Sequence, residues 1–124
     1  MRNKFNARKI EVDGIVFDSK RESRRYQQLK ALEQAGEISD LELQKPFELI
    51  PNICEPDTVG ARGGVKKGKV IQRKTVYIAD FVYKRDGKTI VEDAKGCRYG
   101  AAYQVFKLKK KIFFWQTGIE IQEV

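Results

Sequence analysis

The stretch from Val76 to Gly96 (VYIADFVYKRDGKTIVEDAKG) constrains the fold of this chain more than any other. Two apolar, β-prone runs flank Asp86-Gly87, a dipeptide that is typical of a tight two-residue hairpin turn. If these two residues form the loop, Arg85 faces Lys88, and this pair fixes the register of the whole ladder. The sequence therefore predicts a β-hairpin whose cross-strand partners can be read off directly.

The register of this hairpin brings two acidic residues together. Counting back from the turn, Asp80 faces Asp93, whereas Glu92 faces Phe81. Because side chains alternate along a strand, Asp80, Asp93 and Lys95 share one face, and Glu92 lies on the other. Like charges that face each other directly are destabilising, so two carboxylates within apolar strands need a counter-charge. We expect a divalent metal ion here, with Lys95 beside it. The alternative is a surface ion pair between Asp93 and Lys95, with Asp80 at a strand end.

Composition points to a nucleic-acid partner. The chain has 124 residues, enough for one domain with a hydrophobic core, and a formal net charge of +8 with a pI near 9.5. A small basic protein most often binds a polyanion, although a merely soluble basic domain is the alternative. The longest large-apolar run is Ile112–Trp115, so no membrane span is expected. The basic first eight residues lack a signal-peptide core and are predicted to form a loose segment.

The absence of histidine excludes several kinds of active site. Ser-His-Asp, Cys-His and histidine–metal chemistry are not available to a chain without histidine. Any general base must be a carboxylate, a lysine, a tyrosine or a metal-bound water. Cys54 and Cys97 are too few for a disulfide framework or a cysteine zinc site, which favours a reducing cytoplasm.

The order of elements predicts an α/β (α+β) fold, a mixed sheet flanked by helices, in a single domain of residues 1–124. The predicted elements are a hairpin at 9–17 with an Asp13-Gly14 turn, a helix from about 19 to 34, a strand at 41–50 interrupted or edged at Pro46, the central hairpin, a helix from about 99 to 114, and a strand at 119–124. Ala102, Val105, Leu108 and Ile112 repeat at helical spacing and are expected to pack on the sheet.

Glu22 has two interpretations. Ser19 and Glu22 have the spacing of a capping box at the start of the first helix, which explains Glu22 structurally. Glu22 also lies on the stripe of Tyr26 and Leu29, the core-facing side, so it could reach a metal on the sheet beneath. The two roles are not exclusive. Gln44 is interpreted as an ordinary polar strand residue, with a place near the site as the alternative.

Two basic segments are candidate phosphate contacts. A Gly-rich loop at about 57–75 has no acidic residue after Asp57 and is suited to wrapping a phosphate backbone; a solvated hairpin tip is the alternative. The second segment is the lysine cluster at 107–111, for which complementing the helix dipole is the simpler explanation. The predicted DNA-binding residues are Arg62, Lys66, Lys67, Lys69, Arg73, Lys74, Lys107 and Lys110.

The carboxylates suit phosphodiester hydrolysis. Oxygen-rich sites that hold Mg²⁺ or Mn²⁺ supply charge neutralisation and an activated water. Asp80, Asp93 and Glu22 would provide carboxylates, and Ala94 its backbone carbonyl. Lys95 would orient or deprotonate the attacking water, or neutralise charge in the transition state.

The segments YIADF and VEDAKG, with the upstream FDSKRESRRY helix, resemble the PD-(D/E)XK nuclease superfamily, in particular its small phage- and prophage-encoded members. The resemblance covers nearly the whole chain. It matches Asp80 to the first motif acid, Asp93 and Lys95 to (D/E)-x-K, and Glu22 to the acid on the first core helix; Ala79 stands where proline is typical.

The resemblance implies a metal-dependent DNA endonuclease of the Holliday-junction resolvase type, acting on branched DNA in recombination or replication in a bacterial host cytoplasm. Two symmetric incisions imply a homodimer. The alternatives are a catalytically idle nuclease-fold DNA-binding protein, a transposon-end-type nuclease, and a small basic RNA-binding protein.

Overall fold

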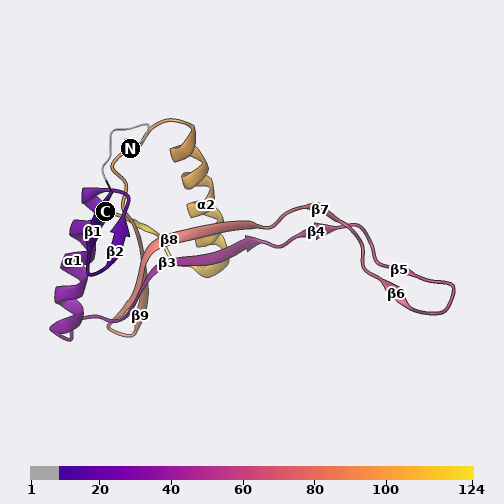
Figure 1. Cartoon of the computed structure of the whole chain (residues 1–124), viewed down its shortest axis with the longest axis horizontal. Helices are drawn as coiled ribbons and strands as arrows, with labels where there is room; N and C mark the ends of the chain where they lie inside the picture. The colour runs from indigo at the N-terminus through magenta and orange to yellow at the C-terminus, as the bar shows by residue number, and fades with distance from the viewer. Residues whose placement is uncertain (1–8) are drawn as a thin grey trace.

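The structure, a computed structural model, describes residues 9–124, and the predicted N-terminal segment 1–8 lies outside these residues. A four-stranded mixed sheet with the order β10-β9-β8-β3 forms the centre of the body. β3 and β9 run antiparallel to β8, and β10 runs parallel to β9. Two helices pack on this sheet, which confirms the predicted fold class (Figure 1).

The bounds of the elements are β1 (Ile10–Val12), β2 (Ile15–Phe17), α1 (Lys20–Gln34), β3 (Ser39–Ile50), β4 (Ile53–Cys54), β5 (Thr58–Val59), β6 (Val65–Lys66), β7 (Val70–Gln72), β8 (Thr75–Arg85), β9 (Lys88–Asp93), α2 (Ala101–Thr117) and β10 (Gln122–Glu123).

The central hairpin, formed by β8 and β9, has the predicted register. Arg85 pairs with Lys88 and Phe81 with Glu92. Asp86 and Gly87 both have positive φ angles, 52° and 75°, as the tight hairpin turn requires. The β1–β2 hairpin uses the same chemistry at its own Asp-Gly turn. Pro46 lies in β3, an edge strand of this sheet, where proline removes no ladder hydrogen bond on its outer side.

The core has one cluster on each face of the sheet. On one face, Tyr26 and Leu29 of α1 pack with Phe81 and Tyr83. On the other, a cluster beneath α2 contains Phe106, Phe113, Tyr77, Val91 and Ile121. Burial of these aromatic and aliphatic side chains stabilises the body at roughly 25 cal/mol per Å² of apolar surface.

Two predictions about the C-terminal part are wrong. Of the four residues predicted to pack on the sheet, Ile112 does pack against the core. Ala102 is exposed, and Val105 and Leu108 are 53% and 59% exposed, because α2 turns its aromatic stripe inward instead. The final strand is limited to Gln122–Glu123, and α2 continues to Thr117, where Gly118 at a φ of 73° ends it. Within residues 9–124, no helix is long and apolar enough to cross a membrane.

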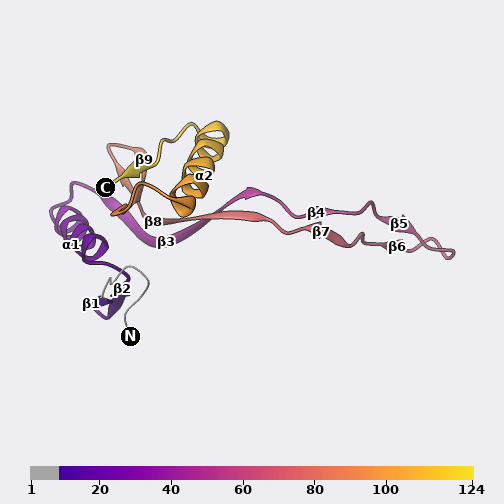
Figure 2. The ribbon, with the colours of Figure 1, turned by 90° about the horizontal axis from the view of Figure 1, so that it is seen from above.

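The predicted basic loop is a paired structure. β4 pairs with β7, and β5 with β6, so residues 51–74 form a two-stranded ribbon that protrudes from the sheet between β3 and β8 (Figures 1 and 2). We call this segment the arm.

Candidate metal and phosphodiester site

Three polar side chains from three elements meet on the α1 side of the sheet. The Nε2 group of Gln44, on β3, donates hydrogen bonds to Glu22 Oε1 and to Asp80 Oδ1, each at 3.0 Å. The backbone N–H of Glu22 donates to Ser19 Oγ at 3.2 Å, so this half of the predicted cap is present. The Glu22 carboxylate itself points to Gln44. The helix start therefore uses the backbone N–H of Glu22, whereas the site uses the carboxylate of the same residue.

Asp93 and Lys95 form the second half of the site. Asp93 is 5% exposed; its Oδ1 lies 2.9 Å from Lys95 Nζ, and its Oδ2 accepts a hydrogen bond from the Tyr77 hydroxyl at 2.8 Å. The Lys95 ammonium lies 4.0 Å from the centre of the Phe106 ring, a cation–π contact that holds it in place. An ion pair between Asp93 and Lys95 is what the alternative interpretation predicts, but Asp93 is buried rather than at the surface, and Asp80 lies within β8 rather than at a strand end.

Asp80 joins the two halves. Its Oδ2 accepts a hydrogen bond from the N–H of Ala94, the residue between Asp93 and Lys95, at 2.8 Å. The β8–β9 ladder ends at Phe81 and Glu92, one pair before Asp80 and Asp93. The strands therefore part where the two acids would otherwise face each other. The site residues Glu22, Asp80, Asp93 and Lys95 are thus brought together, as is the Ala94 backbone.

The side-chain alternation of two strands reverses at the site. On β8, Ala79 belongs to the α2-side core and Phe81 to the α1-side core, although they are two residues apart. On β3, Leu43 and Phe47 show the same reversal, around Gln44, whose φ is 51°. A positive φ is rare for a residue other than glycine and concentrates at functional sites. This local twist aims Gln44 at Glu22 and Asp80, and sequence analysis missed it because alternation is assumed to continue along a strand.

The electrostatics reflect crowded carboxyl groups. Burial, together with Asp80, Asp18 and Asp93, raises the pKa of Glu22 to about 7. The pKa of Asp80 is raised by burial and by Asp93, against the lowering effect of the Ala94 N–H. Burial and Asp93 also raise the pKa of the Tyr77 hydroxyl. Like charges close together disfavour ionisation, and a cation between them would relieve this cost.

The donor set fits a hard divalent cation of the Mg²⁺ type. Such an ion takes oxygen ligands, keeps several waters and is commonly held by one or two carboxylates plus substrate phosphates. Within the described part of the chain, no three side chains of the His, Cys, Asp and Glu types form a ready-made cluster. Asp80 with either Glu22 or Asp93 would therefore hold the ion, and the Ala94 carbonyl stays a predicted ligand.

Glu92 lies on the opposite face from Asp93, as the register predicts. It is 2% exposed and accepts two hydrogen bonds from Arg25, from Nε and from Nη2, each at 2.7 Å. The Tyr83 hydroxyl donates to it as well, and Glu92 raises the pKa of Tyr83, with burial as the main cause, to about 12. Glu92 is therefore a structural acid that attaches α1 to the sheet. Sequence analysis did not find Arg25 as its partner.

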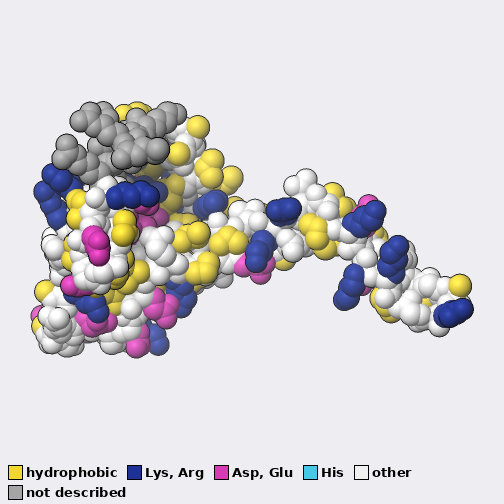
Figure 3. Space-filling view, viewed as in Figure 1, with side chains coloured by type: hydrophobic (Ala, Val, Ile, Leu, Met, Phe, Trp, Pro, Cys, Tyr) yellow, Lys and Arg dark blue, Asp and Glu magenta, His cyan; other side chains and the backbone are white. Residues whose placement is uncertain are grey.

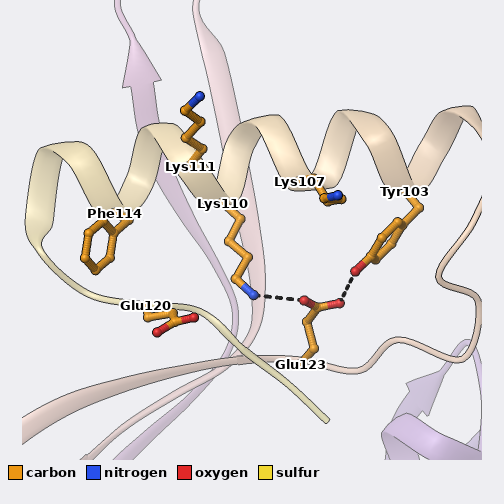
Figure 4. A pocket seen from close by; sticks show the side chains of 7 residues that line it. All are labelled: Tyr103, Lys107, Lys110, Lys111, Phe114, Glu120 and Glu123. Carbon is orange, nitrogen blue, oxygen red and sulfur yellow. Dashed lines mark hydrogen bonds and ion pairs between the residues drawn. The ribbon is translucent and has the colours of Figure 1, made fainter.

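The predicted phosphate contacts lie in two places. The arm carries Arg62, Lys66, Lys67, Lys69, Arg73 and Lys74, all exposed (Figure 3). On α2, Lys107 is exposed, whereas Lys110 Nζ is held by Glu123 Oε2 at 2.8 Å, and Tyr103 binds the other oxygen of this carboxylate (Figure 4). These side chains line a cavity of about 390 Å³ between α2 and the C-terminal segment. Lys110 is thus committed to an internal ion pair and is the weakest of the predicted contacts.

The fold and the site define a class of protein: an α+β domain with a mixed four-stranded sheet, in which Asp80 and Asp93 of the sheet lie close to Lys95 and to Glu22 of α1. The chain belongs to the family described as "Protein of unknown function (DUF1064)", whose profile matches residues 2–121. No curated protein and no solved structure matches it significantly.

Proposed function

We propose that this protein is a Mg²⁺- or Mn²⁺-dependent DNA endonuclease of the PD-(D/E)XK type. The observation that carries the proposal is the junction of β8 and β9, where Asp80 binds the Ala94 N–H and Asp93 binds Lys95. Two neighbouring carboxylates next to one fixed ammonium are the groups that metal-assisted phosphodiester hydrolysis needs.

Each residue has a distinct role in this proposal. When bound, the metal ion supplies Lewis-acid charge neutralisation and a more acidic water. Asp80, together with either Asp93 or Glu22, would supply the carboxylate oxygens for this ion, at the place where the inner strands β8 and β9 part. Lys95 positions the attacking water or compensates negative charge that develops on the phosphate. Gln44 sets the spacing of Glu22 and Asp80 through its two hydrogen bonds.

The substrate class that we propose is branched DNA, with the basic arm and α2 holding phosphates. Cutting both strands of a junction symmetrically requires two copies of the site, and hence a homodimer in the host cytoplasm. Val105, Leu108 and Trp115 are exposed on α2 and offer an apolar surface for such pairing. Sedimentation of the Leu108→Glu variant tests it, because a charge at the centre of this surface should favour the monomer.

Cleavage of supercoiled, linear, nicked, flapped and four-way DNA in Mg²⁺ tests the activity. Asp93→Asn and Lys95→Met should each lower the rate by roughly a hundredfold or more. Asp86→Asn is the matched control, because it makes the same chemical change at a turn that tolerates asparagine. Parent-like cutting by Asp93→Asn would refute the assignment.

A second candidate function is DNA binding by a catalytically idle site. Its supporting observation is that each acid already has internal donors: Gln44 for Glu22 and Asp80, and Lys95 and Tyr77 for Asp93. This candidate predicts retarded DNA in a gel shift and no nicking with either Mg²⁺ or Mn²⁺. It also predicts no thermal stabilisation by these metals.

A further inference from the structure

The arm is a large feature of the described residues that the carboxylate site does not explain. Every residue of 51–74 is exposed except Gly68, which is partly buried. A two-stranded ribbon without a sheet partner or a covering helix is marginally stable in water and gains little from its own packing. Figures 1 and 2 show it extending away from the body in both views. Such a protrusion is expected to act by contacting something outside the chain.

The arm has a built shape, which distinguishes it from a loose loop. Its strands cross closely at the middle, where the Glu55 N–H donates to the Lys69 carbonyl at 2.8 Å and the Gly68 N–H to Asp57 Oδ1 at 2.8 Å. A Cβ atom on Gly68 would lie 1.7 Å from the backbone oxygen of Glu55, so only glycine permits this crossing. At the root, Lys74 N–H donates to Asn52 Oδ1 at 2.7 Å. The crossing sets the angle between the two halves of the ribbon.

The charge of the arm selects a polyanion as its partner. It carries six basic residues against Glu55 and Asp57, and the basic groups are spread along its length in Figure 3. Lys67 approaches Asp57 only to 4.0 Å, and neither Lys66 nor Lys69 has an ion-pair partner among residues 9–124. Cations spaced along a ribbon match phosphates spaced along a nucleic-acid backbone.

The dimensions of the arm match a groove of duplex DNA. From Thr75 to Gly63, a fully extended chain at ~3.3 Å per residue would reach roughly 40 Å, which sets the upper limit on the length of the arm. One turn of B-DNA is about 34–36 Å long, and its major groove admits a two-stranded β-ribbon. Val59 pairs with Val65, and Thr58 with Lys66, so neighbouring pairs present apolar and basic side chains on opposite faces. Apolar side chains can contact thymine methyl groups in this groove while lysines reach the phosphates.

We propose that the arm lies in the major groove of B-form DNA that flanks the site, over about one helical turn. The inference rests on the proposed function only in taking DNA as the partner. It also distinguishes DNA from RNA, because the major groove of an A-form duplex is too deep and narrow for side chains to read. The groove, rather than charge alone, is therefore the specific element of the proposal.

Binding is measured by fluorescence anisotropy in chelator, so that cleavage plays no part. The probes are DNA duplexes shorter than one turn and three turns long, and an RNA duplex of the longer sequence. Lys66→Ala/Lys69→Ala should weaken binding to the long DNA and lower the salt slope by roughly 0.9 for each phosphate that the variant no longer neutralises. The matched control, Lys84→Ala/Lys88→Ala, changes two exposed lysines at the β8–β9 turn, at the opposite end of β8 from the arm. It should leave binding close to that of the parent.

Two glycine variants test the shape of the arm. Gly68→Ala should reduce the affinity for long DNA and leave the thermal midpoint of the body unchanged, because the clash lies within the arm. Gly64→Ala, whose Cβ meets no atom within 4 Å, should bind as the parent does. Dimethyl sulfate methylation of guanine N7, a major-groove atom, should be suppressed over about one turn by the parent and not by Gly68→Ala.

Three outcomes would overturn the groove proposal. They are an equal loss of DNA affinity in the two double-lysine variants, an affinity of the parent for the RNA duplex equal to that for the long DNA duplex, and guanine N7 atoms that the parent does not protect from methylation. Association of the protein through the arm without DNA would also overturn it, in favour of a second copy as the occupant. These results are independent of cleavage. If the variants bind DNA as expected but the parent does not nick DNA, the nuclease proposal is refuted and the groove proposal stands. If the parent nicks DNA but the arm variants bind DNA as tightly as the parent, the groove proposal is refuted and the nuclease proposal stands.

Discussion

At the scale of single residues, adjacent acids on β9 have opposite environments. Asp93 meets Lys95 and Tyr77, whereas Glu92 is fixed by Arg25 and Tyr83. The turn register alone predicts which acid lies on which face, because a two-residue loop leaves only one pairing. It does not predict Arg25, since the partner comes from a helix whose rotation about its axis depends on tertiary packing.

The Arg25–Glu92 pair yields a stability prediction. Removal of one partner leaves a buried charge without compensation, so Arg25→Met should lower the free energy of unfolding by about 3 kcal/mol. Its exposed neighbour provides the control, and Arg24→Met should stay within about 0.5 kcal/mol of the parent. Urea unfolding measures both. Equal values for the two variants would show that the pair does not anchor α1.

The position of Gln44 in the site is the part that sequence patterns do not predict. The sequence favours an ordinary strand residue, with a place near the site as the alternative. The alternative is confirmed, because a φ of 51° turns the amide toward Glu22 and Asp80. Strain at one position is invisible to patterns that assume regular strands. The positions of Asp93 and Lys95 relative to Glu92 were predictable because they follow from the register of β9, whereas the position of Gln44 depends on a departure from regular strand geometry.

At the scale of elements, α2 can be tested by contrasting its two apolar stripes. Phe113 is 1% exposed and Leu108 is 59% exposed. Phe113→Ala should destabilise the protein by about 3–5 kcal/mol, whereas Leu108→Gln, measured at a protein concentration low enough to keep the chain monomeric, should change stability by less than about 0.5 kcal/mol. Thermal or urea unfolding of the two variants checks the assignment. A large loss for Leu108→Gln would mean that this stripe is buried, in the body or between copies.

The same helix explains why its inward face was predicted wrongly. Its sequence contains two stripes at helical spacing, one aliphatic through Val105 and Leu108, and one aromatic through Phe106 and Phe113. Periodicity cannot rank two stripes, and the larger aromatic area determines the outcome. The arm was predicted as a loop for a related reason: its glycines and short apolar pairs give no sustained alternation, so pairing is visible only in three dimensions.

At the scale of the whole molecule, the crowded carboxyl groups make stability depend on pH. Glu22 has an ordinary pKa of 4.5 when unfolded and about 7 when folded, so the folded state binds more protons between these values. In chelator, the contribution of Glu22 to the free energy of unfolding should therefore be fully present below about pH 4.5 and be lost as pH rises through 7. We expect a loss of about 1–2 kcal/mol, after allowance for partial solvent screening.

Urea midpoints at pH 5.5 and 8 check this dependence, with Glu22→Gln as the test variant. Glutamine keeps the size of the side chain but does not ionise, so the pH dependence should be smaller in this variant. Glu48→Gln, at an exposed position on β3, should keep the slope of the parent. An identical slope in all three proteins would contradict the raised pKa of Glu22.

Metal binding should stabilise the folded protein through the same carboxyl groups, and this stabilisation should increase with pH. An ion that binds only the folded site raises stability by about 2.7 kcal/mol at a concentration a hundred times its Kd. Protons compete with the metal for carboxylates, so the rise in Tm caused by Mg²⁺ or Mn²⁺ should be larger at pH 8 than at pH 6. In Glu22→Gln, the difference between the Tm shifts at the two pH values should be smaller, because only the raised pKa of Asp80 still contributes to it. In Asp80→Asn, metal should not raise the Tm at either pH. Calorimetry with and without metal at both pH values measures these shifts. A parent shift that is equal at the two pH values would remove Glu22 from the ligand set, and a full shift in Asp80→Asn would place the ion elsewhere on the molecule.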